Sequence, residues 1–294
     1  MRALLLLILA GLVSACSPTR LFNGLAAVGS GEVQRIRDES YGPHARNRLD
    51  VYVPARGDGA PKPILVFLYG GSWSDGRKET YPFAALAFAG RGFVTVVPDY
   101  RLVPEVRYPT FLEDNAAAVR WARDNAVRFG ADPNRIVLVG HSAGAYNAAM
   151  LALDQRWLDR AGVPRSSIRA WAGLAGPYDF LPLDDPATIA AFGRTPDLPA
   201  TQPGAYVDRA DPPAFLATGS TDERVAPRHT RDLAARLQAE GVPVETRFYP
   251  TVGHVGIVLA LSSPFRGRAP VLDDVVGFLR ARSGPAPAAG PGAD

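Results

Sequence analysis

No other stretch of this 294-residue chain limits its fold as tightly as the pentapeptide Gly140-His141-Ser142-Ala143-Gly144. The segment 135–139 before it is apolar and rich in β-branched residues, which predicts a buried strand. The segment 145–153 after it is rich in alanine and leucine, which predicts a helix. The pentapeptide therefore predicts a sharp strand-to-helix turn, where the glycines allow close packing and the serine is lifted out of the sheet. The alternative is a glycine-rich turn that carries its serine by chance.

Strand-like and helix-like segments alternate through the middle of the chain, which predicts a mostly parallel sheet with helices on both faces. The predicted strands are 33–37, 47–53, 64–69, 93–97, 135–139, 168–174, 214–218 and 244–249, and the predicted helices are 81–90, 109–129, 145–153, 228–240 and 272–282. The first two strands are expected to be antiparallel, and segment 54–63 to form a hairpin or a loop. Segment 176–211 is too long and too aperiodic for an ordinary connection, so we expect it to pass over the active site as a cap.

The N-terminal sequence is typical of a targeting segment. Residues 1–15 combine a basic start with an apolar run shorter than the roughly 20 residues that span a bilayer, which predicts a secretory signal peptide. Its end, Val13-Ser14-Ala15-Cys16, resembles the lipobox of bacterial lipoproteins. That resemblance implies lipidation of Cys16 and, because Ser17 follows it, an anchor in the outer membrane facing the periplasm. The alternative is an ordinary signal peptide with a cysteine at its cleavage site.

The composition adds limits on partners and domains. Lys and Arg (32) nearly balance Asp and Glu (29), and no basic block is interleaved with aromatic residues, so we expect no nucleic-acid partner. Cys16 is the only cysteine; once acylated, it leaves no thiol for a disulfide, metal or redox role. We expect a tether at 16–31, one α/β domain at 32–282 and a disordered tail at 283–294.

A serine nucleophile needs a base beside it, and four histidines are candidates. His254 lies in a Gly-flanked loop after the last predicted strand, and loops after parallel strands gather at the edge where Ser142 emerges. We therefore predict His254 as the base. His141 adjoins the serine and is expected to be structural, His44 precedes the parallel strands, and His229 is expected to be solvated on a polar helix.

The acid that orients the base is expected in the loop after 214–218, the predicted strand that comes before the last one. Asp222 is the first acid after the end of that strand. Glu223, one residue further, and Asp211, before the strand, are rivals, and a helix N-cap is the alternative role of Asp222. The chain order Ser142, Asp222, His254 is typical of an α/β-hydrolase triad.

The segment Tyr69-Gly70-Gly71-Ser72-Trp73 follows the strand predicted at 64–69. The paired glycines Gly70 and Gly71 let the backbone approach a substrate and expose its amides. We predict an oxyanion hole at this segment, with the amides of Gly71, Ser72 and Ala143 as donors. The alternative is a tight turn with a buried Trp73.

From about Val51 to Arg282 the chain resembles the hormone-sensitive-lipase-like and carboxylesterase-like branch of the α/β hydrolases. The motifs that carry the resemblance are Tyr69–Trp73, Asp99-Tyr100-Arg101-Leu102 with Pro104-Glu105, Asp132–Ile136 and the pentapeptide. The Gly-Gly-x-Trp form is closer to kynurenine-formamidase-like and feruloyl or acetyl-xylan esterase-like members. Where the branch usually has a histidine that braces the glycine loop, this chain has Tyr69.

The resemblance implies hydrolysis of a small-molecule carboxylic ester through an acyl-enzyme, without cofactor or metal. Two other functions stay open on the sequence alone. One is an amidase or peptidase that uses the same triad, and the other is a catalytically silent binding protein of the cell envelope.

Overall fold

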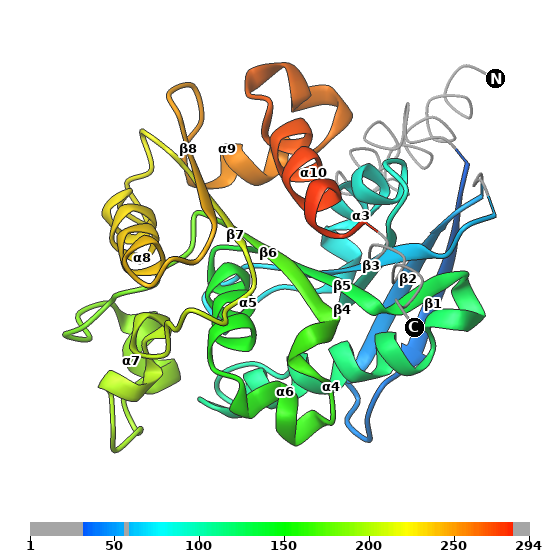
Figure 1. Cartoon of the computed structure of the whole chain (residues 1–294). Coiled ribbons are helices and arrows are strands. Elements are labelled where there is room, and N and C mark those ends of the chain that lie inside the picture. Colours follow the sequence, from blue (N-terminus) through cyan, green and yellow to red (C-terminus); the bar gives the residue numbers. More distant parts are fainter. Residues whose placement is uncertain (1–31, 56–58, 285–294) are drawn as a thin grey trace, which may run out of the picture.

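The computed structural model describes residues 32–55 and 59–284, which are arranged around an eight-stranded sheet (Figure 1). The predicted signal peptide, tether and Cys16 lie outside the described residues. The strands are β1 (Val33–Ser40), β2 (Arg48–Pro54), β3 (Lys62–Leu68), β4 (Val94–Pro98), β5 (Ala131–His141), β6 (Ile168–Leu174), β7 (Ala214–Gly219) and β8 (Val244–Tyr249). Their order in the sheet is β1-β2-β4-β3-β5-β6-β7-β8. β1 and β2 run antiparallel, and β3 to β8 are parallel to one another, as the sequence predicted.

Helices cover both faces of the sheet. They are α3 (Pro82–Ala89), α4 (Thr110–Asp124), α5 (Ala143–Leu153), α6 (Arg156–Ala161), α7 (Pro186–Phe192), α8 (Arg228–Ala239), α9 (His254–Leu259) and α10 (Val271–Arg282). α3 and α10 pack on one face, and α4, α5 and α6 on the other (Figure 1). None of the helices within residues 32–55 and 59–284 has both the length and the apolar character needed to cross a bilayer.

One local prediction needs correction, and the alternative left open for segment 54–63, a hairpin or a loop, is decided. The helix predicted at 109–129 is broken, because α4 ends at Asp124 and a 3-10 turn (Ala126–Phe129) follows, closed by Gly130 at φ +67°. Segment 54–63 is not a hairpin, because β2 pairs with β4 and leaves β3 on the far side of β4. Turn residues mark where a strand ends, but the partner of a strand is decided by the sheet as a whole.

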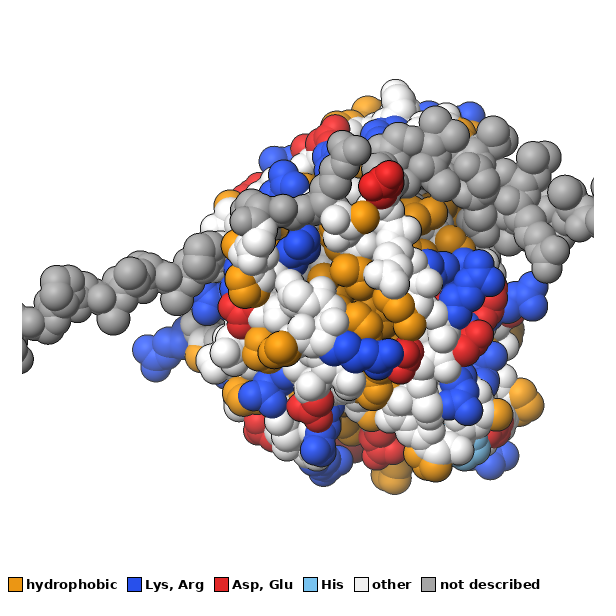
Figure 2. All heavy atoms as spheres, turned by 90° about the vertical axis from the view of Figure 1, so that its right-hand side faces the viewer, with side chains coloured by type: hydrophobic (Ala, Val, Ile, Leu, Met, Phe, Trp, Pro, Cys, Tyr) orange, Lys and Arg blue, Asp and Glu red, His pale blue; other side chains and the backbone are white. Residues whose placement is uncertain are grey.

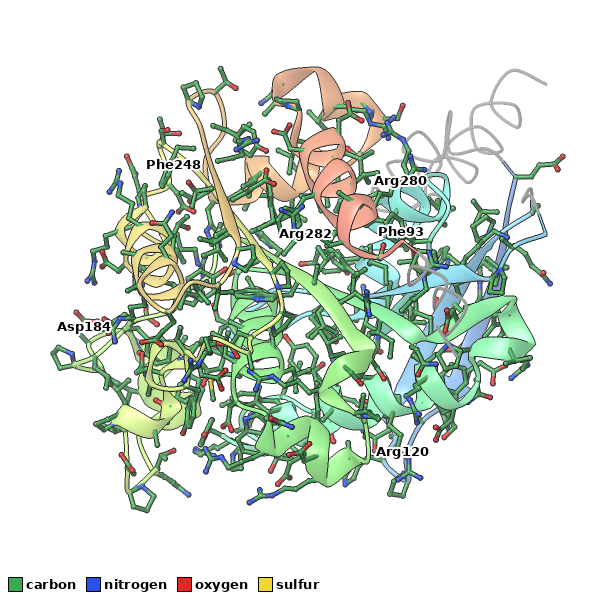
Figure 3. All side chains as sticks on the ribbon, in the orientation of Figure 1. Phe93, Arg120, Asp184, Phe248, Arg280 and Arg282 are labelled. Carbon is green, nitrogen blue, oxygen red and sulfur yellow. The ribbon has the colours of Figure 1, made fainter. Side chains whose placement is uncertain are left out.

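The described chain also extends into the predicted tail. Ser283 is buried, and its carbonyl accepts a hydrogen bond from Arg135 Nε over 2.6 Å. The side chain of Arg280 lies beside Phe93 (Figure 3), where its guanidinium donates to the carbonyl of Arg91. These contacts hold the end of α10 against the sheet as far as Gly284, and the rest of the predicted tail lies outside the described residues.

Figure 2 shows the face of the molecule beside β1, where acidic and basic side chains are intermingled. One pair at this edge joins Arg128 to Glu39 of β1, with 2.7 Å between Nη2 and Oε1. The neighbouring pair of Arg35 and Asp50 is partly buried, with 2.5 Å between Nη2 and Oδ2. Opposite charges that pair across β1 and β2 help to hold this antiparallel edge together.

Candidate active site

Ser142 occupies the turn between β5 and α5 in a conformation that side-chain-bearing residues rarely adopt, with φ +55° and ψ −124°. The glycines on either side allow the turn by their lack of a side chain. A Cβ on Gly140 would lie 2.1 Å from the carbonyl oxygen of Gly144, and one on Gly144 would lie 2.0 Å from that of Leu68. The close packing of β3, β5 and α5 therefore forces the serine out of the sheet.

The structure brings Ser142, His254 and Asp222 into one hydrogen-bond chain. Ser142 Oγ lies 2.9 Å from His254 Nε2, and His254 Nδ1 lies 2.8 Å from Asp222 Oδ2. Asp222 follows β7, and His254 begins the short helix α9 rather than lying in an open loop. The rival acids lie elsewhere: Glu223 is exposed, and Asp211 pairs with Arg165.

Asp222 is buried but remains suited to a negative charge. Burial by itself raises the pKa of its carboxyl, but hydrogen bonds from His254 and from the amides of Val225 and Arg224 outweigh burial and lower the pKa below its usual range. Asp222 is therefore ionised at neutral pH. Asp222 also accepts from the amides of the turn before α8, but it is not the N-cap of that helix, a position that Pro227 occupies.

His141 does not reach Ser142, as expected for a structural residue. Its Nε2 donates to the carbonyl of His254 over 2.9 Å. Burial lowers the pKa of His141 to about 3, and the neighbouring His254 contributes to this shift to a smaller extent, so the ring is neutral. His141 thus holds the backbone of the histidine that faces Ser142. His44 is far more exposed than His141, and its Nδ1 lies 3.3 Å from Oε1 of Glu105.

Residues 70–73 form a loop, called the glycine loop below, that runs against Ser142. A Cβ on Gly70 would lie 2.8 Å from the Cβ of Ser142, and Gly71 has φ +139°, with its carbonyl accepting from the amides of Ser74 and Asp75. Within the described part of the chain, the amides of Gly70, Gly71 and Ser72 have no protein acceptor. Ala143 is the first residue of α5, where an amide has no acceptor in its own helix. Amides from both segments are thus available beside the serine oxygen.

Tyr69 anchors the start of the glycine loop. Its hydroxyl donates to Asp99 Oδ1 over 2.7 Å and accepts from Arg46 Nη2 over 3.0 Å. The ring stacks between Tyr81 and Tyr100, with centroids 5.3 and 4.9 Å away. The tyrosine therefore supplies the brace for which the related branch uses a histidine.

We expect Tyr69→Phe to lower the free energy of unfolding by about 1 to 3 kcal/mol, because the buried Asp99 carboxylate loses its hydroxyl donor. Urea unfolding measures the change. Tyr81→Phe is the matched control, since Tyr81 stacks on the same ring and its hydroxyl has no hydrogen-bond partner in the described part of the chain. Equal midpoints for the two variants would show that the Tyr69 hydroxyl does not anchor the loop.

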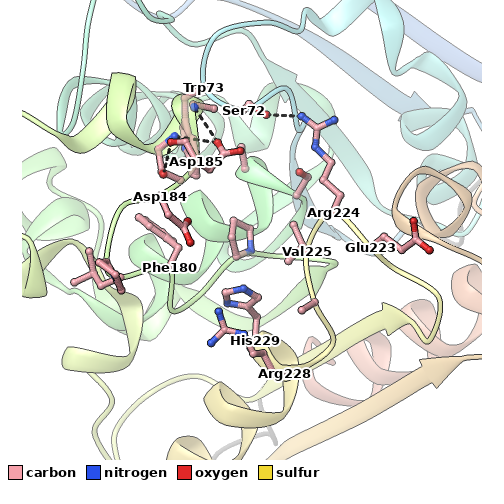
Figure 4. A pocket seen from close by; sticks show the side chains of 18 residues that line it. Ser72, Trp73, Phe180, Asp184, Asp185, Glu223, Arg224, Val225, Arg228 and His229 are labelled. Carbon is pink, nitrogen blue, oxygen red and sulfur yellow. Dashed lines mark hydrogen bonds between the residues drawn. The ribbon is translucent and has the colours of Figure 1, made fainter.

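A cavity of about 330 Å³ opens beside Ser142 (Figure 4). One wall comes from segment 176–211, including Phe180 and Leu181, and the opposite wall comes from the β7–α8 loop and the start of α8. A second cavity, of about 430 Å³, lies on the side of Ser142 that includes the glycine loop and Val255. The serine oxygen therefore has space on two sides, as an acyl group and a leaving group require.

Aromatic packing holds segment 176–211 beside the serine. Trp73 lies 4.9 Å from Phe192 and 6.1 Å from Phe180 between ring centroids, and its Nε1 donates to Asn147 Oδ1 over 3.0 Å. The hydroxyl of Tyr146 on α5 donates to the carbonyl of Thr201 over 2.6 Å. The segment is thus tied directly to the helix that follows Ser142.

The prediction for His229 was wrong. The residue is buried, lines the 330 Å³ cavity and accepts a hydrogen bond from the amide of Asp179. The four-residue spacing of positions 229, 233 and 237 could have revealed this, because it places His229 on the same face of α8 as Leu233 and Leu237, which are both buried. Sequence reasoning also missed Arg224, whose Nη2 donates to Ser72 Oγ over 3.1 Å (Figure 4).

Within residues 32–55 and 59–284, no group of three or more His, Cys, Asp or Glu side chains is arranged to hold a metal ion.

A mostly parallel eight-stranded sheet, with a serine at a strand-to-helix turn and an aspartate and a histidine after β7 and β8, defines an α/β hydrolase. Within that class, residues 49–237 match the BD-FAE family, and the protein belongs to this family.

Individual relatives agree with this class. The chain is 31% identical over 265 residues to the isoprenylcysteine alpha-carbonyl methylesterase ICME of Arabidopsis thaliana, a match that covers 82% of this chain and 61% of the plant protein. It is 34% identical over 232 residues to the carboxylesterase NlhH of Mycobacterium tuberculosis, with 70% of each chain covered. The chain thus spans about three fifths of the length of the plant relative.

Among solved structures, a phosphonate-inhibited esterase B of Lactobacillus rhamnosis superposes with a TM-score of 0.75 at 21% identity, with 96% of each chain covered. At this level of identity, the likeness shows that the two chains share a fold.

Proposed function

We propose that this protein hydrolyses carboxylic esters of small molecules, with Ser142 as the nucleophile, His254 as the base and Asp222 as the residue that orients the imidazole. The proposal rests above all on the continuous hydrogen-bond chain of 2.9 and 2.8 Å through the two nitrogens of His254. The names of the two relatives, a methylesterase and a carboxylesterase, support the same chemistry.

The reaction follows from which groups can donate. The carboxylate of Asp222 only accepts, so the proton of the neutral imidazole lies on Nδ1 and Nε2 accepts from Ser142. As the serine oxygen bonds to the ester carbonyl carbon, its proton moves to Nε2, and negative charge develops on the carbonyl oxygen. The bond to the alcohol then breaks, and His254 protonates the departing oxygen. Water attacks the acyl-enzyme by the same route and releases the acid.

The glycine loop and the start of α5 supply the oxyanion hole. The amides of Gly71, Ser72 and Ala143 donate to the developing oxyanion, and each such donor lowers the barrier by about 3 to 4 kcal/mol. Because the backbone of the turn and the brace at Tyr69 hold these amides in advance, little reorganisation accompanies the reaction.

A matched ester and amide test this proposal. The esterase proposal predicts hydrolysis of p-nitrophenyl acetate and none of p-nitroacetanilide, which carries the same acyl group on the same ring. Preferential cleavage of the anilide would replace the esterase with an amidase. Failure to cleave either compound, together with no labelling of Ser142 by a fluorophosphonate probe, would favour a silent binding protein.

We also propose that Cys16 carries a lipid that anchors the protein in the outer membrane, facing the periplasm. The support comes from the sequence alone, where Val13-Ser14-Ala15-Cys16 closes an apolar run. In a bacterial host given labelled palmitate, the full chain is expected to incorporate label and fractionate with membranes, whereas Cys16→Ala loses both. Equal labelling of the two proteins would rule out the anchor.

A further inference from the structure

His229 has no part in the mechanism above, although its imidazole borders the cavity beside Ser142. It lies at the start of α8, and only 7% of the residue is exposed. In Figure 4 its ring points from the helix into the space that the lining side chains enclose. A polar ring buried at the wall of a substrate-sized cavity needs a hydrogen-bond partner there.

The backbone decides which ring nitrogen of His229 carries the proton. The amide of Asp179 donates to Nδ1 over 3.2 Å, and because an amide N–H only donates, Nδ1 is unprotonated. Burial is the larger cause and the charge of Arg228 the smaller one, and both lower the pKa of the ring, so it is neutral at pH 7. Its proton therefore lies on Nε2, which has no hydrogen-bond partner within the described residues.

The charged side chains around the cavity do not favour an anion. Asp184, Asp185 and Glu223 line it together with Arg224 and Arg228. Arg224 is already bonded to Ser72, and Asp185 accepts from the amide of Ala187 at the start of α7. A substrate carboxylate would lie near more acidic groups than basic ones, three against two, whereas an uncharged oxygen avoids that repulsion.

A hydrocarbon group is also a poor match. If it filled the cavity, it would exclude water from His229 Nε2 and leave that N–H without an acceptor, which is costly for a buried donor. The apolar side chains of Phe180, Leu181 and Trp73 on the other side suit the carbon skeleton of the same substrate group.

We infer that His229 is a specificity-determining residue whose Nε2–H donates to an uncharged oxygen, a hydroxyl or an ether, on the substrate group that occupies this cavity. The inference rests on the proposed ester hydrolysis. It makes His229 a contact of the substrate itself, while His254 remains the base.

Two substitutions separate the roles of the two ring nitrogens. His229→Asn keeps an acceptor near Nδ1 for the Asp179 amide and removes the donor that faces the cavity. His229→Gln places an amide N–H near Nε2 and gives up the bond to Asp179. Only a role for Nε2–H predicts that these two variants behave differently toward an oxygen on the substrate.

The substrates are two pairs of esters that differ by one oxygen in place of one methylene. On the alcohol side, 2-methoxyethyl butyrate is compared with butyl butyrate, and on the acyl side, ethyl 3-methoxypropanoate is compared with ethyl pentanoate. The readout is the ratio of kcat/KM within each pair, divided by the ratio for alkaline hydrolysis, which removes the inductive effect of the oxygen. A general loss of activity in a variant cancels in this ratio.

For the pair that reaches the cavity, we expect a ratio of about 3 to 10 in the wild type and in His229→Gln, falling to about 1 in His229→Asn. Ratios near 1 for both pairs in the wild type would overturn the inference, as would an unchanged ratio in His229→Asn or a lost ratio in His229→Gln. A wild type that hydrolyses none of the four esters would contradict the proposed function itself, so the two failures are distinguishable.

Discussion

Ser142→Ala is expected to lower kcat/KM for p-nitrophenyl acetate by about 10⁴- to 10⁶-fold, the range found when a nucleophile of this kind is removed. Its Oγ contacts His254 Nε2 at 2.9 Å, and among residues 32–55 and 59–284 no other side chain is hydrogen-bonded to that nitrogen. The backbone of the turn is set by the packing of the flanking glycines, so the fold should survive the loss of one oxygen.

Three measurements make this result decisive. The urea midpoint of Ser142→Ala should match the wild type, and labelling by a fluorophosphonate should disappear. Ser220→Ala is the control, because Ser220 is exposed after β7 and its side chain lies outside both cavities. Retention of more than about one hundredth of the wild-type rate in a folded Ser142→Ala protein would contradict the nucleophile assignment.

The second large effect concerns stability. Asp50→Asn is expected to lower the free energy of unfolding by about 3 to 5 kcal/mol, because it removes one charge from a buried cluster and leaves its cations without full compensation. Asp50 is 0% exposed and accepts from Arg35 Nη2 over 2.5 Å, while Lys78 Nζ lies 3.1 Å from its other oxygen. The amide of Asp38 also donates to Asp50 over 3.0 Å, so the carboxylate joins β1, β2 and the segment after the glycine loop.

Lys78 explains why the loss should be large. Burial by itself lowers the pKa of its amine, but hydrogen bonds with Asp38 and Glu79 and the charge of Asp50 outweigh burial and raise the pKa above its usual value. Lys78 is therefore a buried cation that depends on its acidic neighbours.

Urea unfolding of Asp50→Asn is best compared with Asp124→Asn. The pair of Arg120 and Asp124 on α4 is exposed, with 59% and 47% of the two side chains accessible and 3.2 Å between Nε and Oδ2. Exposed pairs contribute little to stability, so its midpoint should stay close to the wild type. If the two variants unfold at the same urea concentration, the buried cluster does not stabilise the fold as argued.

Local chemistry made much of this protein predictable. The strand, the paired glycines and the helix around Ser142 are contiguous, so the turn follows from residue types alone. The rule that parallel strands end at one edge then selected His254 from four histidines and Asp222 from its rivals. Both selections needed only the order of strands along the chain, which alternation with helices made readable.

Other features depend on contacts between distant segments. The sequence of 176–211 has no periodicity, and its path beside Ser142 is set by the packing of Phe180 and Phe192 against Trp73. His229 was assigned to solvent because its helix is polar, although it lies on the face of α8 that packs inward. Its protonated nitrogen is decided by the amide of Asp179, which no local pattern indicates.

The sequence by itself determined the α/β class, the strand-to-helix turn and the three side chains that meet at the edge of the sheet, because each depends on short-range spacing and on chain order. Only the tertiary structure decided the brace at Tyr69, the buried cluster around Lys78 and the walls of the cavity. Those features join groups that are far apart in the chain, and their energies arise only when burial removes water from them.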